Sequence, residues 1–420
     1  MPPESRLMRA CDGALAGVVG GFLQCRTMDW IYLDNNATTR PAERVVEAMR
    51  LALAQDWANP SSVHRLGQQA RRQVELARSA TAALIHCSDS ELVLTSGGTE
   101  SINLALRGSL LQRRWDRPPL LITTAIEHAA VRETAEMLAA GGVDVELLPL
   151  RRGGLIDPGD LEAMLADRAA QRDLTVVSVH WANNETGVIE PIARLAEVCR
   201  AAGPKVLFHT DAVQAVGKIP VDVREAPVDL LSFAAHKFHG PKGVGGLYVR
   251  RGVRLGRQLA GGAQERQRRG GTENVPGIVG LGIAAQLAGE FVSDEKQIAR
   301  LAGMRDRFEQ SVCSAVDDAV VNGGAARLWN TSNVGFARLE AEAIVVGLSE
   351  RGVCVSAGAA CSSGSLEPSA VLLAMGIDEA TAHGSVRFSL SRQTTEAELT
   401  GAAEHVAAVV GKLRRSMPTG

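Results

Sequence analysis

One stretch, residues 229–250, constrains the fold of this chain most strongly, because it places a single lysine at the end of a buried strand. Residues 230–235 form a short and mostly apolar run, which is typical of a strand covered on both faces. A Gly/Pro-rich turn and a second strand, residues 247–249, follow it. Lys237 therefore lies at a strand's carboxyl end, where open α/β sheets place ligand sites. Next to His236 such an amine can form a Schiff base, although the stretch alone favours a strand that simply ends in solvent.

Size and charge limit the classes of function. A chain of 420 residues predicts one large domain and a smaller one. A net charge of -2 provides no basic surface for nucleic acid or an anionic membrane. Seven scattered cysteines without a Cys-x-x-Cys pair indicate neither a disulfide framework nor a structural zinc site. We therefore expect a cytoplasmic protein with small-molecule or protein partners, and with room for one reactive thiol.

The first 29 residues differ in composition from the rest. Their weakly apolar run, residues 13–25, is shorter than the roughly 20 residues that span a bilayer, and Asp12 precedes it. No Ala-x-Ala cleavage site follows, which argues against a signal peptide. We expect residues 1–29 to be an extension that is disordered or lies upstream of a true start at Met28.

A strand, a Gly-Gly turn and a helix are predicted over residues 91–108. Backbone amides at the start of this helix, near Gly98, and the hydroxyl of Thr99 would bind a phosphate. An ordinary capping turn explains the same residues equally well. His128 ends a turn after the next predicted strand, where a lone histidine is more often a structural turn residue.

Polar side chains end two later strands. Asn184 follows one buried strand, and Asp211 ends the next, with Gln214 just beyond it. The carboxylate can keep a heterocyclic nitrogen protonated, or it can cap the following helix, and the amides also suit an ordinary turn. Because only one further strand separates Asp211 from Lys237, we expect both at the same edge of one parallel sheet.

A Gly-rich basic loop, residues 261–277, interrupts the alternation of strands and helices. It is either a mobile surface loop or a loop that reaches a phosphate across a subunit boundary, with Thr272 as its hydroxyl. A long helix over residues 279–312 is then predicted to connect the two domains.

The last domain contains two candidate functional residues. Cys361 lies among small residues, at 357–369, where an exposed and reactive thiol is favoured over a buried structural one. Arg387 is predicted on a strand and suits a bidentate carboxylate clamp, worth about 1.5 to 3 kcal/mol. A surface salt bridge is the alternative for this arginine.

Taken together, the segments resemble the pyridoxal-phosphate-dependent cysteine desulfurases of the NifS/IscS type, in the class V aminotransferase group, over residues 31–413. The sequences of several motifs are more similar to the nitrogenase-associated branch of this family than to its housekeeping branch. The motifs that carry the resemblance stand in the family's order and spacing: YLDNNATTR, NPSS, TSGGTES, EHAAV, WANNETG, HTDAVQAVGK, HKFHGPKGVG, RRGGTEN, CSSGSLEPS and HGSVRFSLSR.

The resemblance implies the α/β architecture of fold type I among pyridoxal-phosphate-dependent transferases. A large cofactor-binding domain, residues 45–290, would hold a mostly parallel seven-stranded sheet flanked by helices. A smaller α+β domain, residues 30–44 and 291–420, would carry the loop with the reactive cysteine. No resident metal is implied, apart from a transient contact of an iron–sulfur cluster with Cys361.

The resemblance also implies roles for individual residues. The catalytic residues would be Lys237, which holds the cofactor, Cys361, which accepts the sulfur, and His128, which stacks on the ring. The cofactor would further be bound by Gly98, Thr99, Asn184, Asp211, Gln214, His236 and, from the other subunit, Thr272. The substrate carboxylate would be bound by Asn184 and Arg387.

The implied reaction converts L-cysteine to L-alanine and leaves the sulfur as a persulfide on Cys361, for iron–sulfur cluster assembly and in particular nitrogenase maturation. The implied partners are a second copy of the chain and a scaffold or other sulfur-acceptor protein. A selenocysteine lyase, another class V aminotransferase and a non-catalytic sulfur-assembly scaffold are the alternatives. Ala234 and Ala235 depart from the family, because they stand where relatives commonly carry a serine or cysteine; the loss of one phosphate-binding hydroxyl predicts weaker cofactor retention. Ala357 and Ala359 replace serines of the cysteine loop, which would alter either the behaviour of the loop or the choice of acceptor.

Overall fold

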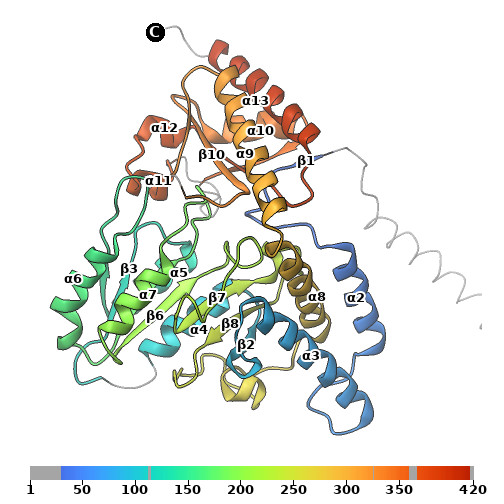
Figure 1. The fold of residues 1–420 in the computed structure, drawn as a ribbon, viewed down its shortest axis with the longest axis vertical. Helices are drawn as coiled ribbons and strands as arrows, with labels where there is room; N and C mark the ends of the chain where they lie inside the picture. The colour runs from blue at the N-terminus through green and yellow to red at the C-terminus, as the bar shows by residue number, and fades with distance from the viewer. Residues whose placement is uncertain (1–29, 112–114, 325, 359–366, 417–420) are drawn as a thin grey trace, which may run out of the picture.

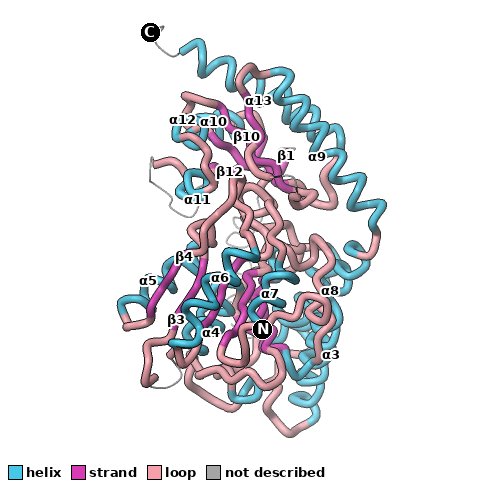
Figure 2. The backbone as a smooth tube through the Cα atoms, turned by 60° about the vertical axis from the view of Figure 1, so that its left-hand side comes forward, coloured by secondary structure: helices cyan, strands magenta, loops and turns pink. Residues whose placement is uncertain are grey.

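The computed structural model describes residues 30–111, 115–324, 326–358 and 367–416 (Figure 1). The predicted N-terminal extension and the predicted sulfur acceptor, Cys361, fall outside the described residues. A larger α/β part lies at the bottom of Figure 1 and a smaller part at the top. Figure 2 shows the strands of these parts as two separate groups.

The larger part contains a seven-stranded sheet in the order β2-β8-β7-β6-β5-β3-β4. Every neighbouring pair is parallel except the pairs that include β8, which runs antiparallel to β2 and β7. The predicted fold class, with a mostly parallel seven-stranded sheet, is therefore confirmed. Its strands are β2 (Leu92–Thr95), β3 (Leu120–Thr123), β4 (Asp144–Leu147), β5 (Thr175–His180), β6 (Val206–Asp211), β7 (Leu230–Ala234) and β8 (Gly245–Val249).

Helices cover both faces of this sheet because alternate strand residues point to opposite sides. Leu121 and Val176 pack with α4 and α5, whereas Ile122 and Val177 belong to the core formed with α3, α6, α7 and α8. The helices of this part are α2 (Glu43–Gln55), α3 (Arg65–Leu84), α4 (Gly98–Leu110), α5 (Ala129–Ala140), α6 (Pro158–Arg168), α7 (Ile192–Ala201) and α8 (Val275–Val292). Single-turn helices are η1 (Asp89–Glu91), η2 (Ala169–Gln171), η3 (Ala235–Lys237) and η4 (Gln264–Gln267).

The smaller part has its own hydrophobic core beneath an antiparallel sheet of order β12-β13-β10-β9. A parallel pair, β1 with β11, joins residues 31–32 to this part. The strands are β1 (Ile31–Tyr32), β9 (Ala319–Val321), β10 (Thr331–Phe336), β11 (Val353–Cys354), β12 (Ser356–Ala357) and β13 (Ser385–Ser389). The helices are α9 (Glu295–Ala315), α10 (Ala341–Ser349), α11 (Ala370–Ala374), α12 (Glu379–His383) and α13 (Glu396–Ser416).

One sequence prediction of helix boundaries is wrong. The single long helix expected over residues 279–312 is two helices, because the side chain of Asp294 caps a new one by accepting a hydrogen bond from the Gln297 amide at 3.0 Å.

Helix α8 is long and apolar enough, by length and composition alone, to cross a membrane. Most of it is buried inside the protein, where it packs against α2 and α3 (Figure 1). A core helix of a globular protein has the same composition, so the hydropathy of α8 does not by itself indicate a membrane span.

Candidate active site

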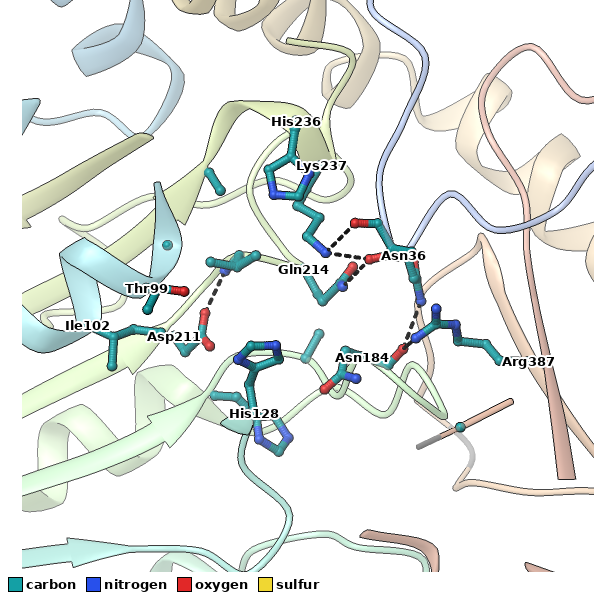
Figure 3. Close-up of a pocket in the computed structure, with 17 residues that line it drawn as sticks. Asn36, Thr99, Ile102, His128, Asn184, Asp211, Gln214, His236, Lys237 and Arg387 are labelled. Atoms are coloured by element: carbon teal, nitrogen blue, oxygen red, sulfur yellow. Dashed lines mark hydrogen bonds between the residues drawn. The ribbon is translucent and has the colours of Figure 1, made fainter. Parts of the chain in front are cut away.

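A cavity of about 360 Å³ opens at the carboxyl edge of the large sheet. The labelled side chains in Figure 3 surround it, with Thr99 at one end and Arg387 at the other. Nine of the residues singled out from the sequence line this cavity: Gly98, Thr99, His128, Asn184, Asp211, Gln214, His236, Lys237 and Arg387. Thr272 is exposed and does not line the cavity within one chain.

The amine of Lys237 is held at the junction of the two parts of the molecule. Its Nζ donates hydrogen bonds to the backbone carbonyls of Asn36 at 2.6 Å and Ala37 at 2.9 Å (Figure 3). Thr39 fixes the neighbouring turn, because its amide at 2.8 Å and its hydroxyl at 2.9 Å both donate to the carbonyl of His236. The segment after β1 therefore orients the amine that the sequence placed at the end of β7.

Asp211 ends β6, the strand that pairs in parallel with β7. Its carboxylate is buried, and its Oδ1 accepts a hydrogen bond from the Val213 amide at 3.0 Å. Burial raises the pKa of this acid, and the neighbouring His128 opposes that rise. Asp211 and Lys237 line one cavity at one sheet edge, so the predicted shared edge is confirmed.

The start of α4 forms the end of the cavity at which the sequence predicts a phosphate. Its first amides lack partners within the helix and point toward the site's Thr99 end. A Cβ added at Gly98 would lie 2.8 Å from Cγ2 of Val213, so this close approach requires glycine. Glu100 accepts a hydrogen bond from the Ser96 amide at 2.8 Å, as expected for the predicted capping turn.

His236 lies beside this cradle and contributes no charge near neutral pH. Burial and the neighbouring charge of Lys237 lower the pKa of His236 to about 4. Its Nδ1 lies 3.2 Å from the hydroxyl oxygen of Thr38. A neutral imidazole here can donate one hydrogen bond to an anion.

Arg387, on β13, forms the opposite end of the cavity. Its Nη2 donates to Oδ1 of Asp34 at 2.8 Å, and its Nη1 donates to the carbonyl of Asn184 at 3.1 Å. Its Nε is buried and has no hydrogen-bond partner among the residues described here. The predicted alternative, a salt bridge, is thus present, but it is buried, and the same arginine lines the cavity.

Two polar cavity residues were not singled out from the sequence. Asn36 stands in the motif YLDNNATTR, and its carbonyl accepts hydrogen bonds from Lys237 and, at 3.0 Å, from Nε2 of Gln214. Two successive asparagines after a strand were the available signal. His180, at the end of β5, also lines the cavity and carried no motif of its own.

A buried lysine completes the polar network at the cavity's base. Lys218 donates to Oδ1 of Asn36 at 2.9 Å and to Oε1 of Gln214. Burial lowers the pKa of Lys218 well below its usual value, and the charges of Lys237 and Arg387 act in the same direction. The amide of Gln214 is therefore held with fixed orientation beside Lys237.

Comparisons with known proteins agree with this geometry. A family model described as aminotransferase class-V matches residues 31–401. A cysteine desulfurase of Trichormus azollae is 46% identical over 392 residues, which are 93% of this chain and 95% of that protein. Cysteine desulfurase NifS of Azotobacter vinelandii is 44% identical over 390 residues, 92% of this chain and 94% of that protein.

Solved structures give the same result. A NifS-like protein superposes with a TM-score of 0.84 at 35% identity, covering 91% of this chain and 100% of that one. The structure of SspA in complex with cysteine has a TM-score of 0.73 at 34% identity and covers 87% of this chain and 99% of that one. The chain therefore belongs to the class V aminotransferase family and, within it, to the cysteine desulfurases.

Proposed function

We propose that this cysteine desulfurase binds pyridoxal 5′-phosphate in the cavity at the sheet edge and takes sulfur from L-cysteine onto Cys361. The observation that carries the proposal is the convergence of an amine, a buried acid, an anion cradle and a buried arginine around one cavity. When bound, the cofactor supplies an electron-withdrawing ring that stabilises the electron pair left on a substrate's α-carbon.

The residues present fit this cofactor. Gly98 lets the backbone approach closely at the start of α4, where amides and a hydroxyl favour a phosphate. Asp211 provides a buried acceptor for a protonated ring nitrogen. The proposed phosphate ligands are Gly98, Thr99 and His236. The proposed ligands of the ring and its phenolic oxygen are His128, Asp211, Gln214 and Asn184.

Lys237 would hold the cofactor, and its amine would accept the proton from the α-carbon of the substrate. Its Nζ is well placed for both tasks, because the two carbonyls that hold it orient the amine beside the cavity. Arg387, which lines the cavity at this end, binds the substrate carboxylate. Substrate is thereby held at the end opposite the phosphate.

Cys361 then completes the transfer. Its thiolate attacks the sulfur of L-cysteine, a sulfur–sulfur bond forms, the carbon–sulfur bond breaks, and the electron pair of that bond stays with the carbon skeleton that becomes alanine. The described residue nearest to this loop on the amino side, Gly358, lines the cavity, which supports a thiol close to the reacting sulfur.

The proposal extends to partners. A homodimer would let the partner subunit's Thr272 reach the phosphate, since Thr272 does not line the cavity of its own chain. The persulfide would pass to an iron–sulfur scaffold or another acceptor protein, with nitrogenase maturation as one destination. We propose a cytoplasmic location for this exchange, where thiols stay reduced.

The decisive experiment incubates the purified chain, saturated with pyridoxal 5′-phosphate, with L-cysteine and dithiothreitol. Alanine and sulfide should appear in equal amounts. Cys361→Ala should lose sulfide release but still bind the cofactor, whereas the matched variant Cys354→Ala, altered in β11, should keep both. Sulfide release that survives in Cys361→Ala would contradict the proposed acceptor, and absence of both products with wild-type protein would contradict the function.

A further inference from the structure

The unassigned histidine of the cavity, His180, lies directly beside the acid proposed for the ring nitrogen. It ends β5 and is 3% exposed. In the parallel pairing of β5 with β6, His180 stands opposite Asp211. Paired residues of neighbouring strands point to the same face and are separated by about 4.8 Å, and both side chains line the cavity.

The imidazole of His180 has a fixed orientation. Its Nδ1 lies 3.1 Å from Oε1 of Glu127. The same oxygen accepts hydrogen bonds from the His180 amide at 3.0 Å and from the hydroxyl of Thr124 at 2.8 Å. The carboxylate of Glu127 therefore contacts both the backbone amide and the ring of His180.

Three carboxyl groups surround this one ring. Besides Glu127 and Asp211, Glu190 places its Oε1 3.9 Å from Nε2 of His180. That Nε2 has no hydrogen-bond partner in the part of the chain that the structure describes. Although burial opposes it, the negative charges of Glu127, Glu190 and Asp211 raise the pKa of His180 to about 9. The ring is therefore an imidazolium at neutral pH.

A charge at this place matters because Asp211 is buried. Burial favours the protonated acid, and a protonated acid would no longer attract a positively charged ring nitrogen. His128 and the hydrogen bond from the Val213 amide also oppose this shift, whereas the charge of Glu127 favours it. His180 opposes it from the end of β5, at the wall of the same cavity.

We propose that His180, held by Glu127, is a positioning residue that keeps Asp211 ionised and thereby sets the selectivity of the cavity for a cofactor ring that carries a protonated nitrogen. This inference rests on the proposed function, because it concerns the same cofactor. It assigns a role to a residue and a carboxylate partner that touch neither the phosphate cradle nor the substrate arginine.

The test is a binding measurement on the apo-chain, with no turnover required. Dissociation constants are measured for pyridoxal 5′-phosphate and for its 1-deaza analogue, in which carbon replaces the ring nitrogen. The ratio of the two constants reports the ring-nitrogen contact alone. His180→Gln should lower this preference about tenfold, because Asp211 loses a neighbouring positive charge that favours its ionised form. A structural role alone would weaken both ligands equally.

A control variant makes the test specific. His209→Gln is the matched control, because His209 is equally buried in the same sheet but bonds to the hydroxyls of Ser178 and Ser232. It should leave the preference unchanged.

The outcomes separate the proposals. In an Asp211→Asn background, His180→Gln should have no further effect on the preference, since the two changes act on one contact. An unchanged preference in His180→Gln, an additive effect, or a neutral His180 ring in ¹⁵N NMR spectra of the wild-type apo-chain at pH 7 would overturn the inference. Wild-type protein that binds neither ligand would instead contradict the proposed function.

Discussion

Replacing Asn36 by alanine tests how the cavity is assembled from the two parts of the molecule. Its Nδ2 donates to Oγ1 of Thr331 at 2.9 Å and to the carbonyl of Asn184 at 3.1 Å. Its Oδ1 accepts from Lys218 at 2.9 Å and from Nδ2 of Asn330 at 3.0 Å. The side chain thus links two segments that follow strands of the large sheet to the start of β10 in the smaller part.

The size of the effect follows from the partners that remain. A buried polar group left unsatisfied costs about 1 to 3 kcal/mol. Lys218, Asn330 and Thr331 each keep one other hydrogen bond, so the four lost bonds do not add in full. We expect Asn36→Ala to lower the free energy of unfolding by about 3 kcal/mol. The carbonyl that holds Lys237 belongs to the backbone and is retained.

Urea unfolding of the apo-chain measures this change as a lower midpoint at unchanged slope. Asn36→Asp should cost less, because it retains the acceptor for Lys218 and adds a charge that favours the ammonium. Asn59→Ala is the matched control, since the side chain of Asn59 lies on the exposed surface and accepts a hydrogen bond from the Ser61 amide. A loss below about 1 kcal/mol in Asn36→Ala would refute the assembly described here.

Three further predictions concern other parts of the structure. Glu265→Gln should lower the free energy of unfolding in urea by about 3 to 5 kcal/mol, because it leaves the buried guanidinium of Arg78, now 2.7 Å from that carboxylate, uncompensated; a change below 1 kcal/mol would contradict it. Burial raises the pKa of Glu185 to about 7, so the folded chain binds an extra proton between about pH 4.5 and 7, and its stability falls as pH rises through that window. In Glu185→Gln, the stability measured by thermal unfolding should fall less steeply across this pH range than in the wild-type chain. An unchanged dependence of stability on pH would argue against the buried acid. Gly98→Ala should weaken pyridoxal 5′-phosphate binding at least about tenfold, since its Cβ would press on Val213; unchanged affinity in a titration of the apo-chain would argue against the cradle.

The sequence sufficed for the parts of the fold that local patterns determine. Short apolar runs predicted the strands of the large sheet, and turn residues after them predicted which side chains meet at its edge. The position of Lys237 one strand beyond Asp211 was enough to place both at the cavity. Helix ends were less certain, since the cap at Asp294 that divides α8 from α9 lies inside a continuous helical pattern.

Long-range contacts could not be predicted from local patterns. The ion pair of Glu265 with Arg78 joins residues 187 positions apart and buries a charge inside a loop that looked too polar for the core. The pairing of Arg387 with Asp34 similarly depends on two sheets meeting. His180 stood in an apolar run, and only the strand register shows that it faces Asp211.

The central claim is that Lys237 is the amine that binds the cofactor. It can be tested by reducing the cofactor-loaded chain with borohydride and locating the pyridoxyl phosphate mass by peptide mass spectrometry. Lys218 is the natural rival, because it lies in the same polar network and its pKa is also lowered by burial. The account predicts the added mass on Lys237 alone, and a label on Lys218, or no label on either lysine, would contradict it.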